Sequence, residues 1–158
     1  MKKGLITFIA TAVGGIAGSV AGIKLSSKTI EPVKKEAEKF KGYYIMLNQW
    51  FALKQEGKTL EKYFVDNNYK TIAIYGMGEM GKRLYNELKD TSIEVKYAID
   101  KEASSIYSEL EVVDKEEQFE EVDVIVITAT FAYLEIEKEL RQKINFPIIS
   151  LDDVVYGS

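Results

Sequence analysis

The pattern of hydrophobic and polar residues first sets apart the N-terminus. Residues 4–23 contain no charged side chain, and Lys2, Lys3 and Lys24 flank them. A helix of this length is about 30 Å long, which matches the hydrocarbon core of a bilayer. The pattern therefore predicts a membrane anchor over residues 1–30, with a spanning helix at about residues 4–23.

Small residues in this span predict helix association. Gly14, Gly18 and Gly22 recur every fourth residue. Residues four apart lie on one helix face, so these glycines leave a groove that a second helix can enter. We therefore expect a homo-oligomer, or a partner helix, at Gly14, Gly18 and Gly22. A signal peptide cleaved near residues 19–21 is the alternative.

The lysines around the span predict its orientation. They are more numerous after residue 23 than before residue 4. Basic residues favour the cytoplasmic side of a membrane. The pattern predicts a single-pass protein of the cell membrane with its C-terminal domain in the cytoplasm.

A heptad pattern follows within residues 31–68, which we expect to form a helical stalk or linker. The apolar residues alternate between spacings of four and three: Val33, Ala37, Phe40, Tyr44, Leu47 and Phe51. Such a helix either packs on its own domain or forms a parallel dimer stalk. Pro32 marks its expected start and Gly57 its end. Thr59 is the expected N-cap of a short helix over residues 60–66.

Residues 69–158 alternate between short apolar runs and helical patterns. Strands are expected over residues 70–75, 93–99, 111–113, 122–128 and 147–151, and helices over 79–89, 116–121 and 131–143. This alternation predicts an α/β fold with a small doubly wound parallel sheet of about five strands in the order 3-2-1-4-5. Ligands bind such sheets at the carboxyl ends of the strands, here around the switch between the first and fourth.

The first expected strand runs directly into a glycine motif, Gly76-Met77-Gly78-Glu79-Met80-Gly81. A G-x-G-x-x-G between a strand and a helix is typical of a dinucleotide-binding loop. The first glycine permits a tight turn, the second lets a pyrophosphate approach the backbone, and the third lets the helix pack on the strand. The helix N-terminus adds free N–H groups, although the Glu79 carboxylate would repel a phosphate. Glycines that serve only the turn, beside a vestigial site, are the alternative.

The ends of the later strands add further candidate ligand contacts. Asp100 lies 19 residues after Gly81, close to the position of an acid that accepts a hydrogen bond from a ribose 2′-hydroxyl. Such an acid favours NAD over NADP, and Lys101 weakens that preference. Asp152 and Asp153 follow the fifth strand, where capping is favoured over lining the crevice. The remaining predicted contacts end the fourth strand: Thr128, Ala129 and Thr130.

The composition limits the chemistry that these residues can perform. The 158 residues include no Cys and no His, which excludes thiolate nucleophiles, His-based triads and most zinc sites. We predict no catalytic residue and no metal site. The net charge of −4 argues against nucleic-acid binding. The charge is uneven, because residues 1–62 hold 11 lysines and 5 glutamates, whereas residues 63–158 are strongly acidic.

Residues 59–151 resemble the Rossmann-type nucleotide-binding domains of bacterial envelope-polysaccharide proteins. Residues 72–81, 97–100 and 124–129 carry the resemblance. The similar groups are capsule-type nucleoside-diphosphate-sugar epimerase/dehydratases and the N-terminal domains of sugar O-acyltransferases, in which the form G-x-G-E-x-G is frequent. Their catalytic modules, an extended epimerase domain or a left-handed β-helix, match no part of these residues.

One literal match to the epimerase chemistry lies in the wrong place. Tyr85 and Lys89 reproduce the spacing of that family's Tyr-x-x-x-Lys pair. They follow the glycine loop on the first helix, where the family's pair does not lie. We therefore expect them to be an exposed flank of the helix.

Together these features predict a membrane-anchored module that binds NAD(H), CoA or a nucleotide-sugar and acts with envelope-polysaccharide enzymes, without catalysis of its own. One alternative is a small NAD(P)-dependent oxidoreductase or sugar-nucleotide enzyme that needs a second chain and takes its acid–base groups from Asp152, Asp153, Tyr75 or Glu79. The other is a scaffold or oligomerisation protein with a vestigial Rossmann domain.

Overall fold

The computed structural model describes residues 27–158. Residues 39–158 form one compact unit, and the described residues 27–38 belong to another. The predicted span at residues 4–23 and its glycines lie outside the described part. Within residues 27–158, none of the helices combines the length and the apolar character needed to cross a bilayer.

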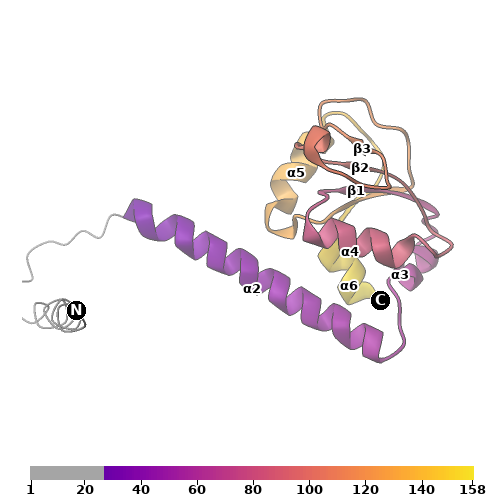
Figure 1. The fold of residues 1–158 in the computed structure, drawn as a ribbon, viewed down its shortest axis with the longest axis horizontal. Coiled ribbons are helices and arrows are strands. Elements are labelled where there is room, and N and C mark those ends of the chain that lie inside the picture. The colour runs from indigo at the N-terminus through magenta and orange to yellow at the C-terminus, as the bar shows by residue number, and fades with distance from the viewer. Residues whose placement is uncertain (1–26) are drawn as a thin grey trace, which may run out of the picture. The chain divides into compact units, whose positions relative to one another are not determined.

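A five-stranded parallel sheet lies at the centre of residues 39–158 (Figure 1). Its order, β3-β2-β1-β4-β5, confirms the α/β fold and the strand order predicted from the sequence. The strands are β1 (Thr71–Tyr75), β2 (Glu94–Ile99), β3 (Val112–Val113), β4 (Val124–Ile127) and β5 (Ile148–Ser150). Tyr75 pairs with Ile99 on one side and Ile127 on the other, so three carboxyl ends meet at one edge.

Helices cover both faces of the sheet. The first face packs against the part of α2 (Ser27–Gln55) from Tyr43 onward, and against α3, α4 and α6. These three helices are α3 (Glu61–Asp66), α4 (Glu79–Leu88) and α6 (Leu151–Gly157). The second face packs against α5 (Tyr133–Leu140) and against Phe119 from the loop after β3. Strand residues alternate between the two faces, as Ile74 and Tyr75 show, because successive side chains of a strand point in opposite directions.

The ends of α2 agree only partly with the prediction. The helix includes Pro32, at which its start was expected. Pro32 is the sixth residue of the helix, where proline keeps a helical φ but leaves the carbonyl of residue 28 without its backbone donor. Gly57 ends the helix as predicted, with a φ of 72°. The Gly57 and Lys58 N–H groups donate to the carbonyls of Lys54 and Leu53, the two bonds of a Schellman motif.

The prediction of Thr59 as an N-cap was wrong. Leu60 takes the N-cap position of α3, and its side chain is fully buried. A carboxylate oxygen of Glu87 on α4 accepts from the Leu60 N–H at 2.9 Å. A side chain distant in the sequence therefore replaces the expected local cap.

The acidic helix expected at residues 116–121 is absent, and this segment forms a turn followed by chain without regular structure. The bonds of a capping box are present at Asp114, but the chain makes only a single turn there and no helix follows. The Asp114 N–H donates to the Glu117 carboxylate, and the Glu116 N–H donates to the Asp114 carboxylate. Phe119 then packs on the second face of the sheet, which a helix of solvated residues would not allow.

The C-terminal helix α6 was not predicted, although its start signal is in the sequence. The Ser150 hydroxyl accepts from the Asp152 N–H, and the Asp153 carboxylate accepts from the Ser150 N–H at 2.9 Å. These bonds form a capping box, the usual start of a helix. Asp153 therefore caps the chain after β5, as favoured from the sequence.

Tyr97 on β2 gives the fold a pH-dependent contribution to stability. Burial first, and the Glu120 carboxylate second, raise its pKa to about 12 from 10.0. Because the folded-state pKa exceeds the unfolded value, this contribution is complete below pH 10 and is lost as the pH rises through 12. We expect the wild type to lose about 2 kcal/mol of unfolding free energy relative to Tyr97→Phe by pH 12. Urea unfolding of both proteins from pH 9 upward measures this difference, and a constant difference would contradict it.

Candidate functional site

The glycine loop begins with a residue whose backbone requires glycine. Gly76 follows β1 with a φ of 95°, which other residues rarely adopt. A Cβ atom there would lie 2.8 Å from the Thr128 hydroxyl oxygen. The Gly76 N–H donates to the Ile99 carbonyl at 2.8 Å, which ties the turn to the end of β2. The first glycine therefore makes the tight turn that the motif predicts.

The last glycine of the motif lets α4 approach the loop. A Cβ atom at Gly81 would lie 2.1 Å from the Gly76 carbonyl oxygen and 3.4 Å from the Ile74 side chain. Gly81 is buried, and its helix packs directly on the end of β1. The close helix–strand contact predicted for this position is present.

Gly78 differs from the other two glycines, because the fold does not require it. Its φ of −67° suits any residue, and a Cβ atom there would meet no atom within 4 Å. It is the N-cap of α4, where the first N–H groups of a helix have no partner within the helix. In the part of the chain that the structure describes, the N–H groups of residues 78–81 donate no hydrogen bond. The loop therefore presents backbone donors beside an open approach.

Asp100 joins the end of β2 to this loop. One oxygen of its carboxylate accepts from the Met77 N–H at 2.8 Å, and the other accepts from the Glu102 N–H at 3.0 Å. Each carboxylate oxygen has two lone-pair positions, so each can accept a further hydrogen bond. Asp100 is only partly buried. It can therefore hold the loop and still accept from a ligand hydroxyl.

A cleft of about 360 Å³ opens at this edge of the sheet. Four of the predicted ligand contacts line it: Gly76, Asp100, Lys101 and Ala129. The remaining lining residues come from the end of β1, from the turn before α5 and from α5 itself: Tyr75, Phe131, Ala132, Glu135, Ile136 and Glu139. One wall is therefore apolar, and the ionised groups around the cleft are mostly carboxylates.

Two of the predicted contacts brace the site from within. Thr128 is buried, and its hydroxyl oxygen lies 3.1 and 2.8 Å from the carbonyl oxygens of Tyr75 and Gly76, which share its single proton. The Thr130 hydroxyl hydrogen-bonds to Asp152, a bond that opposes the rise in the pKa of Asp152 caused mainly by burial.

The remaining predicted residues lie outside the cleft. Met77 is buried in the core and Met80 packs against it. Glu79 is exposed and pairs with Arg83 at 3.6 Å, which offsets part of the carboxylate charge at the helix N-terminus. Tyr85 packs on the core, and its spacing to Lys89 brings no chemistry to this edge.

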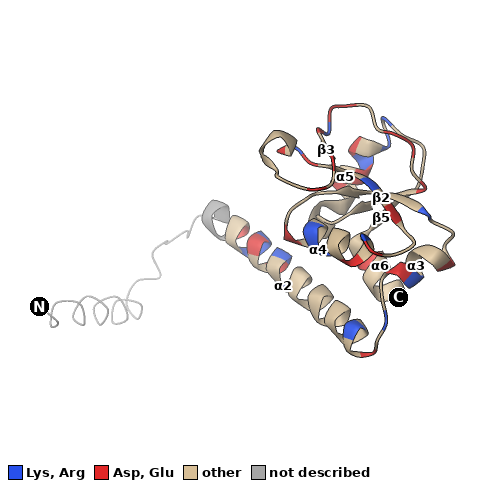
Figure 2. Ribbon diagram, turned by 45° about the vertical axis from the view of Figure 1, so that its right-hand side comes forward, with Lys and Arg blue, Asp and Glu red and all other residues tan. Residues whose placement is uncertain are grey.

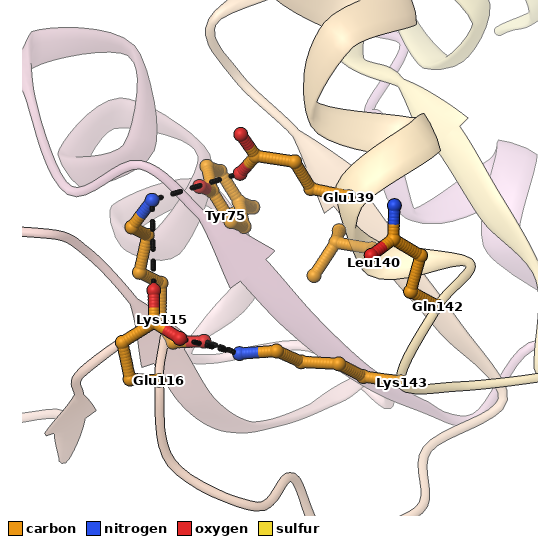
Figure 3. Close-up of a pocket in the computed structure, with 7 residues that line it drawn as sticks. All are labelled: Tyr75, Lys115, Glu116, Glu139, Leu140, Gln142 and Lys143. Carbon is orange, nitrogen blue, oxygen red and sulfur yellow. Dashed lines mark hydrogen bonds and ion pairs between the residues drawn. The ribbon is translucent and has the colours of Figure 1, made fainter.

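A smaller pocket of about 210 Å³ adjoins the cleft, and Tyr75 and Glu139 line both (Figure 3). Its charges are paired, with Lys115 at 3.6 Å from Glu139 and Lys143 at 3.0 Å from Glu116. Burial, then the Glu139 charge, raise the pKa of Tyr75, while Lys115 opposes the rise. The Tyr75 phenol therefore stays protonated and offers a donor between the two pockets.

The cleft residues of α5 and of the turn before it were missed by sequence reasoning. Phe131, Ala132, Glu135, Ile136 and Glu139 recur at helical spacing after the predicted contacts at the end of β4. That spacing is the signal that was available, because one face of a helix starting at the sheet edge must border the crevice.

The fold and the loop define the class of this protein: an α/β domain with a parallel sheet and a G-x-G-x-x-G turn between β1 and α4. Residues 67–148 match the model of the family described as C2185-like, N-terminal. The match covers just over half of the chain, and the chain belongs to this family. The matched residues include the glycine loop and the whole cleft. No curated protein and no solved structure matches the chain.

Proposed function

We propose that this protein is a nucleotide-binding module whose ligand is NAD(H), CoA or a nucleotide-sugar. The observation that carries the proposal is the geometry of the backbone at Gly78. Its Cβ direction is open, its φ needs no glycine, and it stands before backbone donors that lack protein partners. A phosphate approaching these donors is a physical reason for glycine at this position.

The cleft beside the loop suits the nucleoside part of such a ligand. Its volume of about 360 Å³ lies within the usual range for small-molecule sites. Phe131, Ile136 and Ala129 offer an apolar wall for a base, and Asp100 offers an acceptor for a ribose hydroxyl. The phosphates would then reach the N-terminus of α4.

The charges around the cleft favour NAD over NADP. Lys101 lies 3.8 Å from the Glu102 carboxylate, so its charge is partly offset. Asp100, Glu135 and Glu139 line the same cleft. A 2′-phosphate would meet these carboxylates, whereas a 2′-hydroxyl would donate to one of them.

We propose further that the module acts at the cell membrane, as a single-pass protein with its C-terminal domain in the cytoplasm. The uncharged residues 4–23 and the lysines that follow support this placement. The resemblance of residues 59–151 to envelope-polysaccharide proteins supports enzymes of that synthesis as partners. The chain has neither Cys nor His, which supports a binding role without catalysis.

Thermal unfolding and calorimetric titration of the full-length chain in mild detergent test the binding proposal. The ligands are NAD⁺, NADH, NADPH, CoA and UDP-sugars. A ligand at 100 times its dissociation constant should raise the unfolding free energy by about 2.7 kcal/mol. Gly78→Val should abolish this gain, because its side chain fills the approach to the α4 donors.

Gly42→Val is the matched control, because Gly42 lies on α2 and also has no atom within 4 Å of its Cβ direction. It should bind as tightly as the wild type. Absence of binding by every ligand at millimolar concentration, or full binding by Gly78→Val, would refute the proposed site.

A further inference from the structure

Two faces of α2 are apolar, and only one of them is covered by the chain's own core. Met46, Trp50 and Leu53 pack on the sheet unit and are 1%, 6% and 3% exposed. Phe40, Tyr44 and Phe51 point away from it and are 61%, 68% and 62% exposed. Leu47 lies between them at the border of the core. Phe40, Tyr44, Leu47 and Phe51 together form the outer stripe of α2.

The outer stripe lies in an uncharged part of α2. No charged residue occurs between Lys41 and Lys54, as the tan section of α2 in Figure 2 shows. A groove of about 620 Å³ runs beside the stripe, between Leu47 and Phe51 on α2 and Arg83 on α4. An exposed apolar row next to a groove is typical of a surface that binds another helix.

We propose that the outer stripe is the interface between two copies of this chain, with their α2 helices parallel and in register. The heptad places Tyr44 and Phe51 at its a positions and Phe40 and Leu47 at its d positions. These two positions form the seam of a two-stranded coil.

The predicted anchor at residues 4–23 favours the parallel arrangement. Ala37 takes the preceding a position of the heptad, and Ile30 the one before it. Two parallel chains place both anchors at the same end of the pair, where they enter the membrane side by side. An antiparallel pair would place the two anchors at opposite ends.

Charge complementarity also selects the parallel arrangement. In the heptad frame Glu36 takes a g position and Lys41 the following e position. In a parallel coil, a g residue of one helix faces the following e residue of its partner, so Glu36 meets Lys41 of the second copy. In an antiparallel coil, like positions face each other and the same residues would repel.

The groove suits the edge that such a partner presents. The later e positions are Asn48 and Gln55, both exposed amides. A parallel partner brings these side chains toward the g side of the first helix, where Arg83 and Asn86 line the groove. Polar groups thus meet polar groups at the rim, and apolar groups meet at the seam.

Cysteine cross-linking tests the seam directly, because the chain has no native Cys. In membranes that contain the full-length chain, mild oxidation should join Tyr44→Cys into a covalent dimer. Gly42→Cys lies at the outward f position and should cross-link about tenfold less. The Cβ atoms of the two copies are too far apart there for a disulfide. Equal cross-linking at both positions, or none at Tyr44→Cys, overturns the proposal. If Tyr44→Cys does not cross-link and its thiol is also protected from a water-soluble maleimide, the stripe lies on the lipid surface instead.

A charge exchange tests the register. In the Tyr44→Cys background, Glu36→Lys should lower cross-linking, and adding Lys41→Glu should restore it. A double variant no better than Glu36→Lys alone overturns the parallel pairing. Neither experiment involves a nucleotide, so their failure leaves the proposed binding site untouched.

Discussion

Replacing Gly81 with alanine should lower the unfolding free energy of the protein by about 2 to 3 kcal/mol. The added Cβ atom would lie 2.1 Å from the Gly76 carbonyl oxygen, a backbone atom of a turn held by its own hydrogen bonds. Relief requires α4 to move away from β1. Alanine also has the higher helix propensity, worth about 1 kcal/mol, so the loss arises entirely from the packing.

Chemical unfolding of the full-length chain measures this loss, and Gly42→Ala is its matched control. Gly42 also lies within a helix, but its Cβ direction meets no atom within 4 Å. The control should be as stable as the wild type or up to about 1 kcal/mol more stable. If Gly81→Ala behaved like Gly42→Ala, the close contact between α4 and the glycine loop would be refuted.

The three glycines show how far a motif can be interpreted from its sequence. The roles of Gly76 and Gly81 follow from strand, turn and helix geometry, and the structure places a close neighbour beside each. The role predicted for Gly78 concerns a ligand, so the protein's own atoms do not decide it. The glycine that the fold does not need is therefore the one whose substitution separates binding from folding.

The heptad on α2 shows where periodicity becomes ambiguous. The predicted row through Phe40, Tyr44 and Phe51 is regular, but it is largely exposed. The buried row through Met46, Trp50 and Leu53 has the same alternation of spacings. A helix with two apolar faces gives one pattern for each, and only the tertiary structure selects the face that its own core covers.

The cleft could be predicted only in part, because residues far apart in the sequence form it together. Gly76, Asp100 and Ala129 were predicted because each ends a strand, and parallel strands bring their carboxyl ends together. The contribution of α5 depends on the angle at which that helix leaves the sheet, which local sequence does not specify. For the same reason, Thr128 looked like a ligand contact, whereas its hydroxyl braces the glycine turn.

Replacing Glu87 with alanine should lower the unfolding free energy by about 3 kcal/mol. Nothing in the local sequence indicates that this residue is important for stability. It lies on α4 among charged residues, yet its side chain is only 7% exposed. Its carboxylate accepts from the Trp50 indole N–H at 2.6 Å and from the Leu60 N–H at 2.9 Å, and it pairs with Lys54 at 2.7 Å. One side chain thereby joins α2, α3 and α4. Alanine leaves the first two donors without an acceptor, whereas the partly exposed Lys54 can turn to water.

Chemical unfolding monitored by Trp50 fluorescence tests this prediction, because Trp50 is the single tryptophan of the chain. Glu87→Gln should lose less, since its amide oxygen still accepts from one donor. Glu79→Ala is the control on the same helix. The Glu79 carboxylate is 75% exposed in a surface pair with Arg83. Glu79→Ala should therefore lower the unfolding free energy by less than about 0.5 kcal/mol. A loss at Glu87→Ala as small as at Glu79→Ala would show that this carboxylate does not hold the three helices together.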